Sequence, residues 1–282
     1  MKLGQKLAIG LIRARLHLVG VVRPAYAGKM AFRLFCTPFR KAKKKRPDVF
    51  GKAEQVGFHF QNYVVKGFVW NGAAEKKVLI AHGFESTSYN FDRYVMPLVK
   101  AGYGVVAFDA PAHGTSSGKR VNVLQYAAFL EEAAQRYGSI HGILAHSFAG
   151  QATALWLEKG TSSVERIVWI APATEVTAAV KSFVDFLQLS PAITKYFYAE
   201  IERAGGKEIA WYSVSRAVKN ISAPILWIHD EDDTVTPFAD VIPVMETEQS
   251  NIRFMVTKGW GHRQIYRENK VKKAVIAFLT EG

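Results

Sequence analysis

From residue 77 onward, short apolar runs alternate with longer segments that have helical apolar spacing. The runs are VLIAH (78–82), YGVVAFD (103–109), IHGILAH (140–146), RIVWIAP (166–172), PILWIHD (224–230) and IRFMVT (252–257). Candidate helices lie between and after them at 88–101, 121–137, 148–159, 237–246 and 263–280. Continuous apolar strands separated by helices are typical of a parallel sheet covered by helices on both faces. We therefore predict an α/β fold with a mostly parallel sheet.

Two segments depart from this alternation. Residues 56–70 are rich in β-branched and aromatic residues and are bounded by glycines, which predicts one or two antiparallel strands at the start of the sheet. About fifty residues separate Pro172 from Pro224, far more than one crossover helix needs. Their helical spacing and aromatic residues predict a helical cap inserted at about 173–222. The alternative is a long crossover of ordinary helices.

The charge of +13 is confined to one end of the chain. Residues 1–52 contain fourteen Lys or Arg and one acid, Asp48, whereas residues 53–282 contain 23 of each sign. We therefore predict a basic, partly helical N-terminal extension over 1–52 and an electrically neutral domain over 53–282. A neutral domain argues against a nucleic-acid partner. Cys36 is the only cysteine, which excludes an internal disulfide and favours a reducing compartment.

The first 22 residues are too often interrupted by charge to predict a signal peptide or a membrane span. We therefore expect a cytoplasmic protein. In a helical projection Lys2, Lys6, Arg13 and His17 share one side, and Leu3, Leu7, Leu11 and Leu18 share the other. Together with KAKKK (41–45), this pattern suits a helix that lies on an anionic membrane surface. Residues 1–50 would then bind the protein to the inner face of the membrane. The alternative is a helix docked on the body of the protein.

The segment ILAHSFAG (143–150) ends a predicted strand and opens a predicted helix, with Ser147 between them. A nucleophile elbow needs this context, because its strained turn lifts the serine above the sheet. The turn also needs small residues two positions before and after the serine, and Ala145 and Ala149 replace the usual glycines there. We predict that Ser147 is a nucleophile.

Two loops at the ends of predicted strands surround this elbow. HGF (82–84) places the N–H of Phe84 where an oxyanion donor is needed, and the N–H of Phe148 is the expected second donor. In FDAPAHGTSSG (108–118) we expect Ser116 and Ser117 to cap the next helix. His113 in this loop is expected to hold it by hydrogen bonding.

The acid and the base of a serine hydrolase of this kind follow the nucleophile in the chain. PILWIHDEDDTVTP (224–237) is a predicted strand that ends in an acidic loop, and Asp233 suits the register of the acid best, with Asp230 as the alternative. GWGH (259–262) follows the last strand and places His262 at the start of a helix. We predict that His262 is the general base.

HGF, FDAPAHGTSSG, AHSFAG, HDEDDTVTP and GWGH, in this order, resemble the α/β-hydrolase superfamily from about residue 56 to the end. The chain looks most like bacterial serine esterases and lipases with a helical cap. The resemblance implies an eight-stranded-type sheet, the triad Ser147, Asp233 and His262, and an acyl-enzyme formed from a carboxylic ester or thioester. It implies a small-molecule substrate with an apolar acyl group, and neither metal nor cofactor. The alternative is a non-catalytic hydrolase-fold protein that binds a ligand or partner. Oligomeric state is not predicted.

Overall fold

The computed structural model describes residues 3–39 and 45–281, which form two compact units. The sheet unit contains Pro38–Thr174 and Val214–Gly282, and the helical unit contains Met1–Thr37 and Glu175–Ser213, each as far as it is described. Residues 3–37 of the basic N-terminal segment and residues 175–213 of the inserted segment therefore belong to one unit, whereas residues 45–52 of the basic segment belong to the sheet unit. The sequence analysis predicted residues 1–52 as an extension and residues 173–222 as a cap, without any packing between them.

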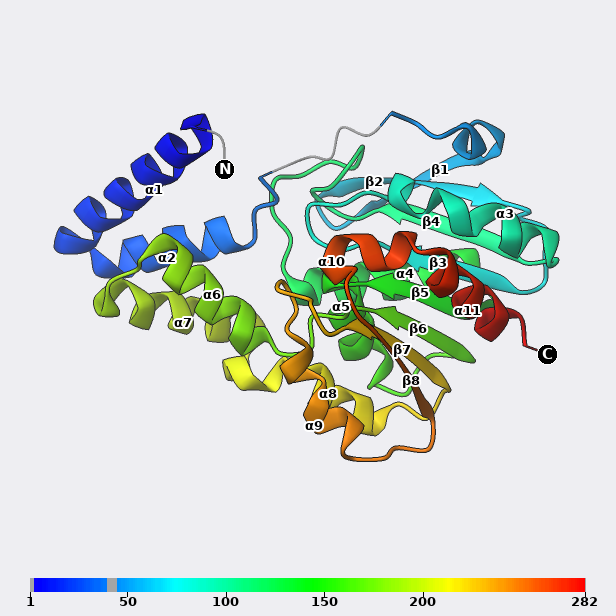
Figure 1. The fold of residues 1–282 in the computed structure, drawn as a ribbon. Coiled ribbons are helices and arrows are strands. Elements are labelled where there is room, and N and C mark those ends of the chain that lie inside the picture. Colours follow the sequence, from blue (N-terminus) through cyan, green and yellow to red (C-terminus); the bar gives the residue numbers. More distant parts are fainter. Residues whose placement is uncertain (1–2, 40–44, 282) are drawn as a thin grey trace. The chain divides into compact units, whose positions relative to one another are not determined.

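The sheet unit is built on eight strands in the order β1-β2-β4-β3-β5-β6-β7-β8 (Figure 1). Their bounds are β1 Glu54–Phe60, β2 Tyr63–Trp70, β3 Lys77–Ala81, β4 Gly104–Asp109, β5 Ile140–His146, β6 Arg166–Ile170, β7 Ile225–Asp230 and β8 Ile252–Thr257. The pairs β1–β2 and β2–β4 are antiparallel, and all later pairs are parallel. This confirms the predicted mostly parallel sheet with an antiparallel start.

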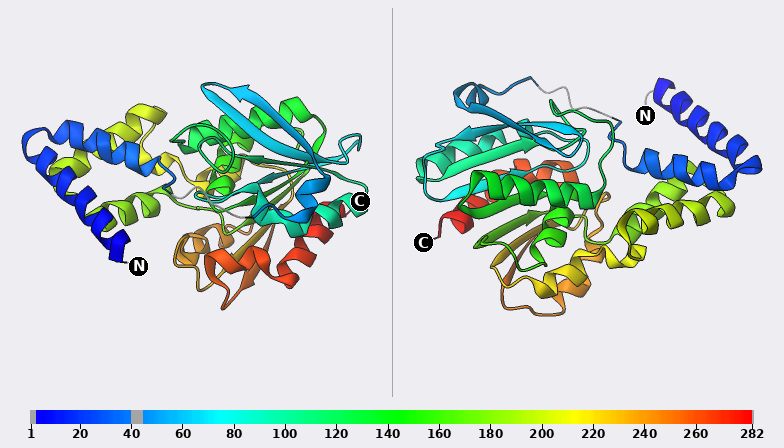
Figure 2. Two further views of the ribbon diagram at one scale, coloured as in Figure 1. Left: turned by 90° about the horizontal axis from the view of Figure 1, so that it is seen from above. Right: turned by 180° about the vertical axis from the view of Figure 1, so that it is seen from behind.

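Helices cover both faces of this sheet (Figure 2). They are α3 Asp92–Lys100, α4 Val123–Tyr137, α5 Phe148–Leu157, α8 Val214–Ala217, α9 Ile242–Met245, α10 Gly261–Gln264 and α11 Asn269–Thr280. Helix α3 contacts α11, and α4 contacts α5. The central strands β4, β5 and β7 are buried along their whole length, which is why their sequences are apolar without alternation.

Three local predictions in the sheet unit were wrong. Residues 263–280 form the end of α10, a 3₁₀ turn and α11 instead of one helix. Residues 237–246 form a short 3₁₀ turn and the four-residue α9 instead of one helix, since Pro237 and Pro243 interrupt the segment. Ser116 and Ser117 do not cap a helix: their hydroxyls accept hydrogen bonds from the N–H groups of Lys66 and Val64 in β2. Helix α4 is instead capped by Asn122.

The helical unit contains α1 Leu3–Val22, α2 Pro24–Phe35, α6 Val176–Leu187 and α7 Pro191–Gly205. Small residues on α2 allow a close approach to α7, because a Cβ at Gly28 would lie 2.5 Å from Cβ of Tyr196. The ring of Phe35 packs edge-on against Phe183 and Phe197. The inserted segment is thus helical, and α2 packs on it.

Parts of the predicted N-terminal extension remain outside the described residues. These are Lys2 and residues 40–44 of the basic run, which include most of KAKKK. Of the helices that the structure describes, none combines the length and apolarity that crossing a membrane requires.

Candidate active site

Strand β5 passes into α5 through a sharp turn at Ser147. This residue has φ 58° and ψ −124°, a strained conformation for a residue with a side chain. Ala145 and Ala149 are fully buried on either side. Gly150 leaves no room for a side chain, because its Cβ would lie 2.6 Å from that of Pro172. The elbow forms with alanines in place of the usual glycines, so the departure from the motif does not prevent the turn.

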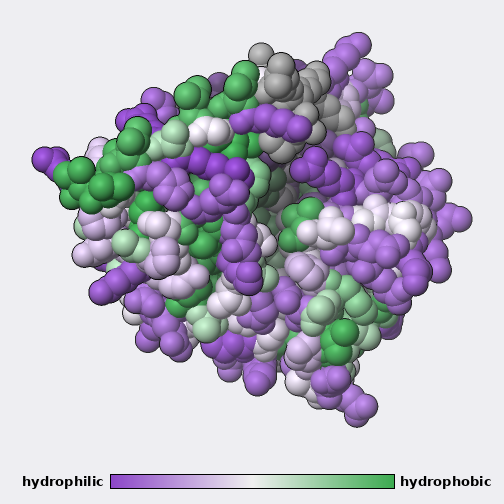
Figure 3. Space-filling model, turned by 60° about the vertical axis from the view of Figure 1, so that its left-hand side comes forward, coloured by the Kyte–Doolittle hydropathy of each residue, from purple (hydrophilic) through white to green (hydrophobic). Residues whose placement is uncertain are grey.

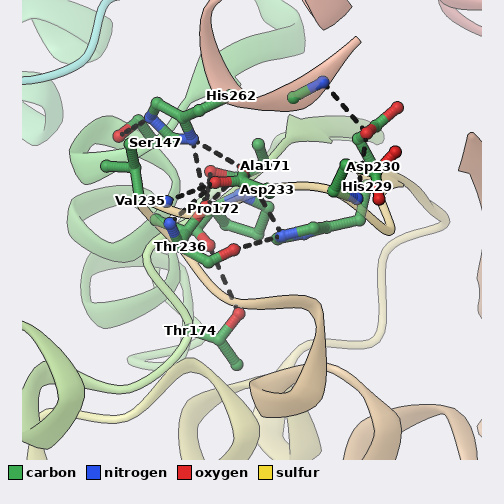
Figure 4. A network of polar contacts seen from close by, with 12 residues as sticks. Ser147, Ala171, Pro172, Thr174, His229, Asp230, Asp233, Val235, Thr236 and His262 are labelled. Atoms are coloured by element: carbon green, nitrogen blue, oxygen red, sulfur yellow. Dashed lines mark hydrogen bonds and ion pairs between the residues drawn. The ribbon is translucent and has the colours of Figure 1, made fainter. Parts of the chain in front are cut away.

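The structure brings together Ser147 from the turn between β5 and α5, Asp233 from the loop after β7 and His262 from the start of α10 (Figure 4). The Nε2 atom of His262 lies 2.9 Å from the Ser147 hydroxyl, and its Nδ1 lies 2.7 Å from Oδ2 of Asp233. Since a carboxylate accepts, Nδ1 carries the proton and Nε2 is free to accept the serine proton. The Asp233 side chain is fully buried, and that of His262 is nearly so.

The Asp233 carboxylate is held on both of its oxygens. Oδ1 accepts hydrogen bonds from the N–H groups of Val235 and Thr236, and Oδ2 accepts from the Thr236 hydroxyl as well as from His262. Burial alone would raise the pKa of Asp233. The hydrogen bond and charge of His262, with the N–H groups of Thr236 and Val235, hold the pKa below its ordinary value. The group is therefore a fixed, ionised carboxylate.

Asp230 has a different set of partners. Its carboxylate accepts hydrogen bonds from the Thr257 hydroxyl and from the N–H groups of Asp232, Trp260 and Gly261. These bonds tie the loop after β7 to the loop that precedes His262. Asp230, the alternative acid of the sequence analysis, thus supports the loop that carries the imidazole.

The two predicted oxyanion donors lie side by side. The rings of Phe84 and Phe148 pack edge-on at 5.3 Å, and neither residue's N–H donates to a protein acceptor within the described part of the chain. A Cβ at Gly83 would lie 2.9 Å from Cβ of Ser147, so only glycine lets the backbone of this loop pass so close to the serine. The loop that carries Phe84 thus passes directly beside Ser147.

Buried histidines and Asp109 hold this loop in place. Nε2 of His82 accepts from the N–H of Ala110, so its Nδ1 carries the proton and donates to the carbonyl of Gly83. Nε2 of His113 accepts from the N–H of Glu85, and its Nδ1 donates to Pro111. His113 therefore fixes the loop, as the sequence analysis expected.

Sequence reasoning missed two residues beside the triad. The Thr236 hydroxyl lies 2.9 Å from Oδ2 of Asp233 and 3.1 Å from Nδ1 of His262. The buried His146 donates from Nε2 to the carbonyl oxygen of His262, 3.1 Å away. Burial, with the nearby His262 imidazole, holds the pKa of His146 well below its ordinary value, so this side chain is neutral. The sequence signalled the turn but not the role of Thr236, because an Asp side chain in a turn commonly accepts from the backbone N–H two residues on, here that of Val235.

A hydroxyl, an imidazole and an ionised carboxylate lie in one hydrogen-bonded series at this site. In such a series an imidazole can take the proton of a hydroxyl. Within the residues that the structure describes, there is no group of three or more His, Cys, Asp or Glu able to hold a metal ion.

The fold and this site define the class of the protein as an α/β-hydrolase. The chain belongs to the family of the serine aminopeptidases S33, whose model matches residues 72–218. This match spans β3 to β6 and the nucleophile elbow, and extends through the inserted segment. None of the curated proteins matches the chain.

Solved structures of α/β-hydrolases share the fold. An esterase from Pyrococcus furiosus is 21% identical with a TM-score of 0.63, over 86% of this chain and 97% of that one. The thioesterase domain from the curacin biosynthetic pathway is 14% identical with a TM-score of 0.60, over 81% and 99%. Mouse α/β hydrolase domain-containing protein 10 is 13% identical with a TM-score of 0.60, over 80% and 96%.

Proposed function

We propose that the protein is a serine hydrolase that cleaves a carboxylic ester or thioester through an acyl-enzyme on Ser147. The observation that carries this proposal is the continuous hydrogen-bonded series from the Ser147 hydroxyl through His262 to Asp233. A strained elbow presents the hydroxyl, and the carboxylate at the other end is ionised. A site that only binds a ligand has no need of such an arrangement.

In the proposed cycle Nε2 of His262 takes the proton of Ser147 as its oxygen attacks the carbonyl carbon of the substrate. The N–H groups of Phe84 and Phe148 stabilise the oxyanion. His262 then returns the proton to the leaving alcohol or thiol, and the acyl group stays on Ser147. Water attacks the acyl-enzyme next, with His262 again accepting a proton. The acid leaves as the bond to Ser147 breaks and His262 returns this proton to the Ser147 oxygen.

Asp233 holds the imidazole in the productive tautomer and stabilises its charged form. Thr236 assists it, because the hydroxyl fixes the carboxylate oxygen that faces His262. Asp109 and His82 do not contact the substrate in this cycle. They hold the loop that carries Phe84 through hydrogen bonds with Thr87 and Ala110.

An ester or thioester with an apolar acyl group suits the site best. The rings of Phe84 and Phe148 lie beside the donors that would hold the carbonyl oxygen, and Tyr126 packs against Phe148. The esterase and the thioesterase domain among the similar structures act on such bonds. The family description names a peptidase, so amide substrates belong in the same experiment.

Turnover of p-nitrophenyl esters with acyl chains of increasing length tests the proposal. Wild type should hydrolyse at least part of this panel, and Ser147→Ala should lower kcat by about 10⁴-fold or more. Ser163→Ala, an exposed serine of the sheet unit, is the matched control and should keep wild-type turnover. An acyl-CoA thioester and an aminoacyl p-nitroanilide then identify the bond preferred.

Wild-type turnover in Ser147→Ala would contradict the proposal. Absence of turnover in wild type on every ester, thioester and anilide, with Ser147 inert to active-site reagents, would instead favour a non-catalytic binding protein. Circular dichroism and the melting temperature establish that the variants are folded.

We also propose that the protein works in the cytoplasm and binds peripherally to the inner face of the membrane through residues 1–50. Support comes from the positive charge of this segment and from the exposed apolar side chains on α1.

A further inference from the structure

Helix α1 carries an apolar stripe on its outer face. Leu7, Leu11, Leu18, Val21 and Val22 are between 62% and 85% exposed. Their spacing of four, seven, three and one residues places them on one side of a helix with 3.6 residues per turn. Hydrophobic side chains also lie open at the upper left of the space-filling view (Figure 3). An amphipathic helix of a globular domain normally turns such a stripe inward.

The opposite face of α1 is already occupied. Leu16 is fully buried, and Gly20 approaches so closely that its Cβ would lie 2.8 Å from Cγ1 of Ile193 in α7. Arg13 donates hydrogen bonds to the carbonyl of Phe186 at the end of α6. The helical unit therefore fixes which face of α1 points outward. The exposed stripe is a second apolar face that this unit leaves uncovered.

Positive charge borders the stripe on both sides. Arg15 lies along one edge and Lys6 along the other, and both are exposed. Helix α2 adds the exposed Arg23 and Lys29. No Asp or Glu occurs in the chain before Asp48, so nothing in this segment offsets the charge. An apolar stripe with basic flanks is the pattern of a helix that lies in a membrane interface.

A second copy of the same face fits this surface poorly. Pairing two α1 helices along their stripes would bring Lys6, Arg15 and Arg23 of each copy together with no acid between them. The stripe is also aliphatic, whereas the centres of protein interfaces are enriched in Tyr, Trp and Arg.

We propose that α1 docks on an anionic lipid bilayer, with its Leu and Val stripe inserted among the upper acyl chains. Lys6 and Arg15 extend from the two edges of the stripe to lipid phosphates, because their long apolar stems lie along the membrane boundary while the charges stay in water. The sequence left two alternatives open for this helix, docking on the protein and docking on a membrane. One face of α1 packs on α6 and α7, and its other face is free for a membrane. This inference rests on the peripheral membrane binding proposed above and names the face of α1 that carries it; it does not depend on the proposed hydrolase activity.

Vesicle sedimentation with the full-length protein tests the proposal. Wild type should bind vesicles of phosphatidylcholine with about one third phosphatidylglycerol, bind pure phosphatidylcholine at least tenfold more weakly, and lose affinity in high salt. The triple variant Leu7→Ser, Leu11→Ser, Leu18→Ser should bind anionic vesicles at least about 100-fold more weakly, since each buried leucine contributes about tenfold.

A matched control removes exposed aliphatic side chains from the sheet unit. Val64→Ser, Ile242→Ser and Val256→Ser, combined, should leave vesicle binding unchanged, since these residues are 37–42% exposed and lie outside α1. A second variant, Lys6→Gln with Arg15→Gln, keeps the stripe and should reduce the preference for anionic over neutral vesicles, since each basic residue near the surface adds about fivefold in affinity, or about 1 kcal/mol. Its charge change leaves the buried face of α1 intact.

Three outcomes overturn the proposal. The first is that the triple variant binds anionic vesicles as tightly as wild type does. The second is that wild type does not bind anionic vesicles. The third is that wild type forms a dimer in light scattering that the triple variant dissociates, with no vesicle binding by either. Hydrolysis of a short soluble ester should be equal in wild type and the triple variant, which separates a failure of docking from a failure of the catalytic proposal.

Discussion

Ser147 sits in a backbone conformation that residues with a side chain seldom adopt. The strain is maintained by its neighbours: the N–H of Ser147 donates to Ile170, and its carbonyl accepts from Gly150 and Ala173. Strain held in this way turns the hydroxyl toward His262 rather than into the helix. In the proposed mechanism, this conformation lets a buried serine present its hydroxyl to His262.

Asp233 and Asp230 should respond differently to the same isosteric change. Asp233→Asn should lower kcat by about 10³-fold or more, because an amide cannot hold the Nδ1–H tautomer of His262 or stabilise its charge. Its backbone partners at Val235 and Thr236 can still donate to the Asn oxygen, so the melting temperature should change little. Steady-state kinetics and thermal unfolding of both variants check this.

Asp230→Asn is the comparison. It weakens the bonds to Thr257, Trp260 and Gly261, so it should lower the melting temperature more than Asp233→Asn does and lower kcat less. If Asp230→Asn instead abolished turnover while Asp233→Asn remained active, Asp230 would be the acid of the site.

At the scale of elements, the helical unit depends on the small residues of α2. Gly28→Ala should destabilise it by about 1–3 kcal/mol, since the new Cβ would press into the backbone and Cβ of Tyr196. Gly10→Ala on α1 has open space around it and should stabilise by up to about 1 kcal/mol, because alanine favours helix. Proteolysis within residues 1–37 as a function of temperature measures both. Equal effects of the two changes would contradict the packing of α2 against α7.

Sequence patterns predicted the elements whose burial is visible in their own local sequence. Strands such as β5 and β7 are apolar because they are buried on both sides, and a turn after each one places Ser147 and Asp233 at the same sheet edge. Patterns failed where a contact joins distant segments. The packing of Gly28 on Tyr196 and the hydrogen bond from His146 to His262 join residues more than 100 positions apart. Ser116 and Ser117 likewise pair with β2, about fifty residues earlier.

For the whole molecule, buried neutral histidines set the response to acid. Burial is the main cause that lowers the pKa values of His82, His146 and His229. In the unfolded chain each takes up a proton near pH 6.5, whereas in the native protein each stays neutral to lower pH. Stability should therefore fall as the pH drops below about 6.5, with a slope of up to about 1.4 kcal/mol per pH unit for each histidine.

The carboxylates contribute in a lower window. The pKa values of Asp109 and Asp233 are depressed in the native protein, so their stabilisation is present above about pH 4 and is lost only as the pH falls further. Urea unfolding between pH 7.5 and 5 therefore reports on the histidines. A midpoint that stays constant over this range would contradict their native neutral state.

The central claim is that Ser147 is an activated nucleophile, and covalent labelling tests it most directly. A fluorophosphonate reacts with a serine only when a base removes its proton and an oxyanion hole stabilises the adduct. The account predicts one adduct on wild type, mapped to Ser147 by peptide mass spectrometry, and none on folded Ser147→Ala or His262→Ala. A folded wild-type protein that stays unlabelled, or an adduct on another serine, would contradict it.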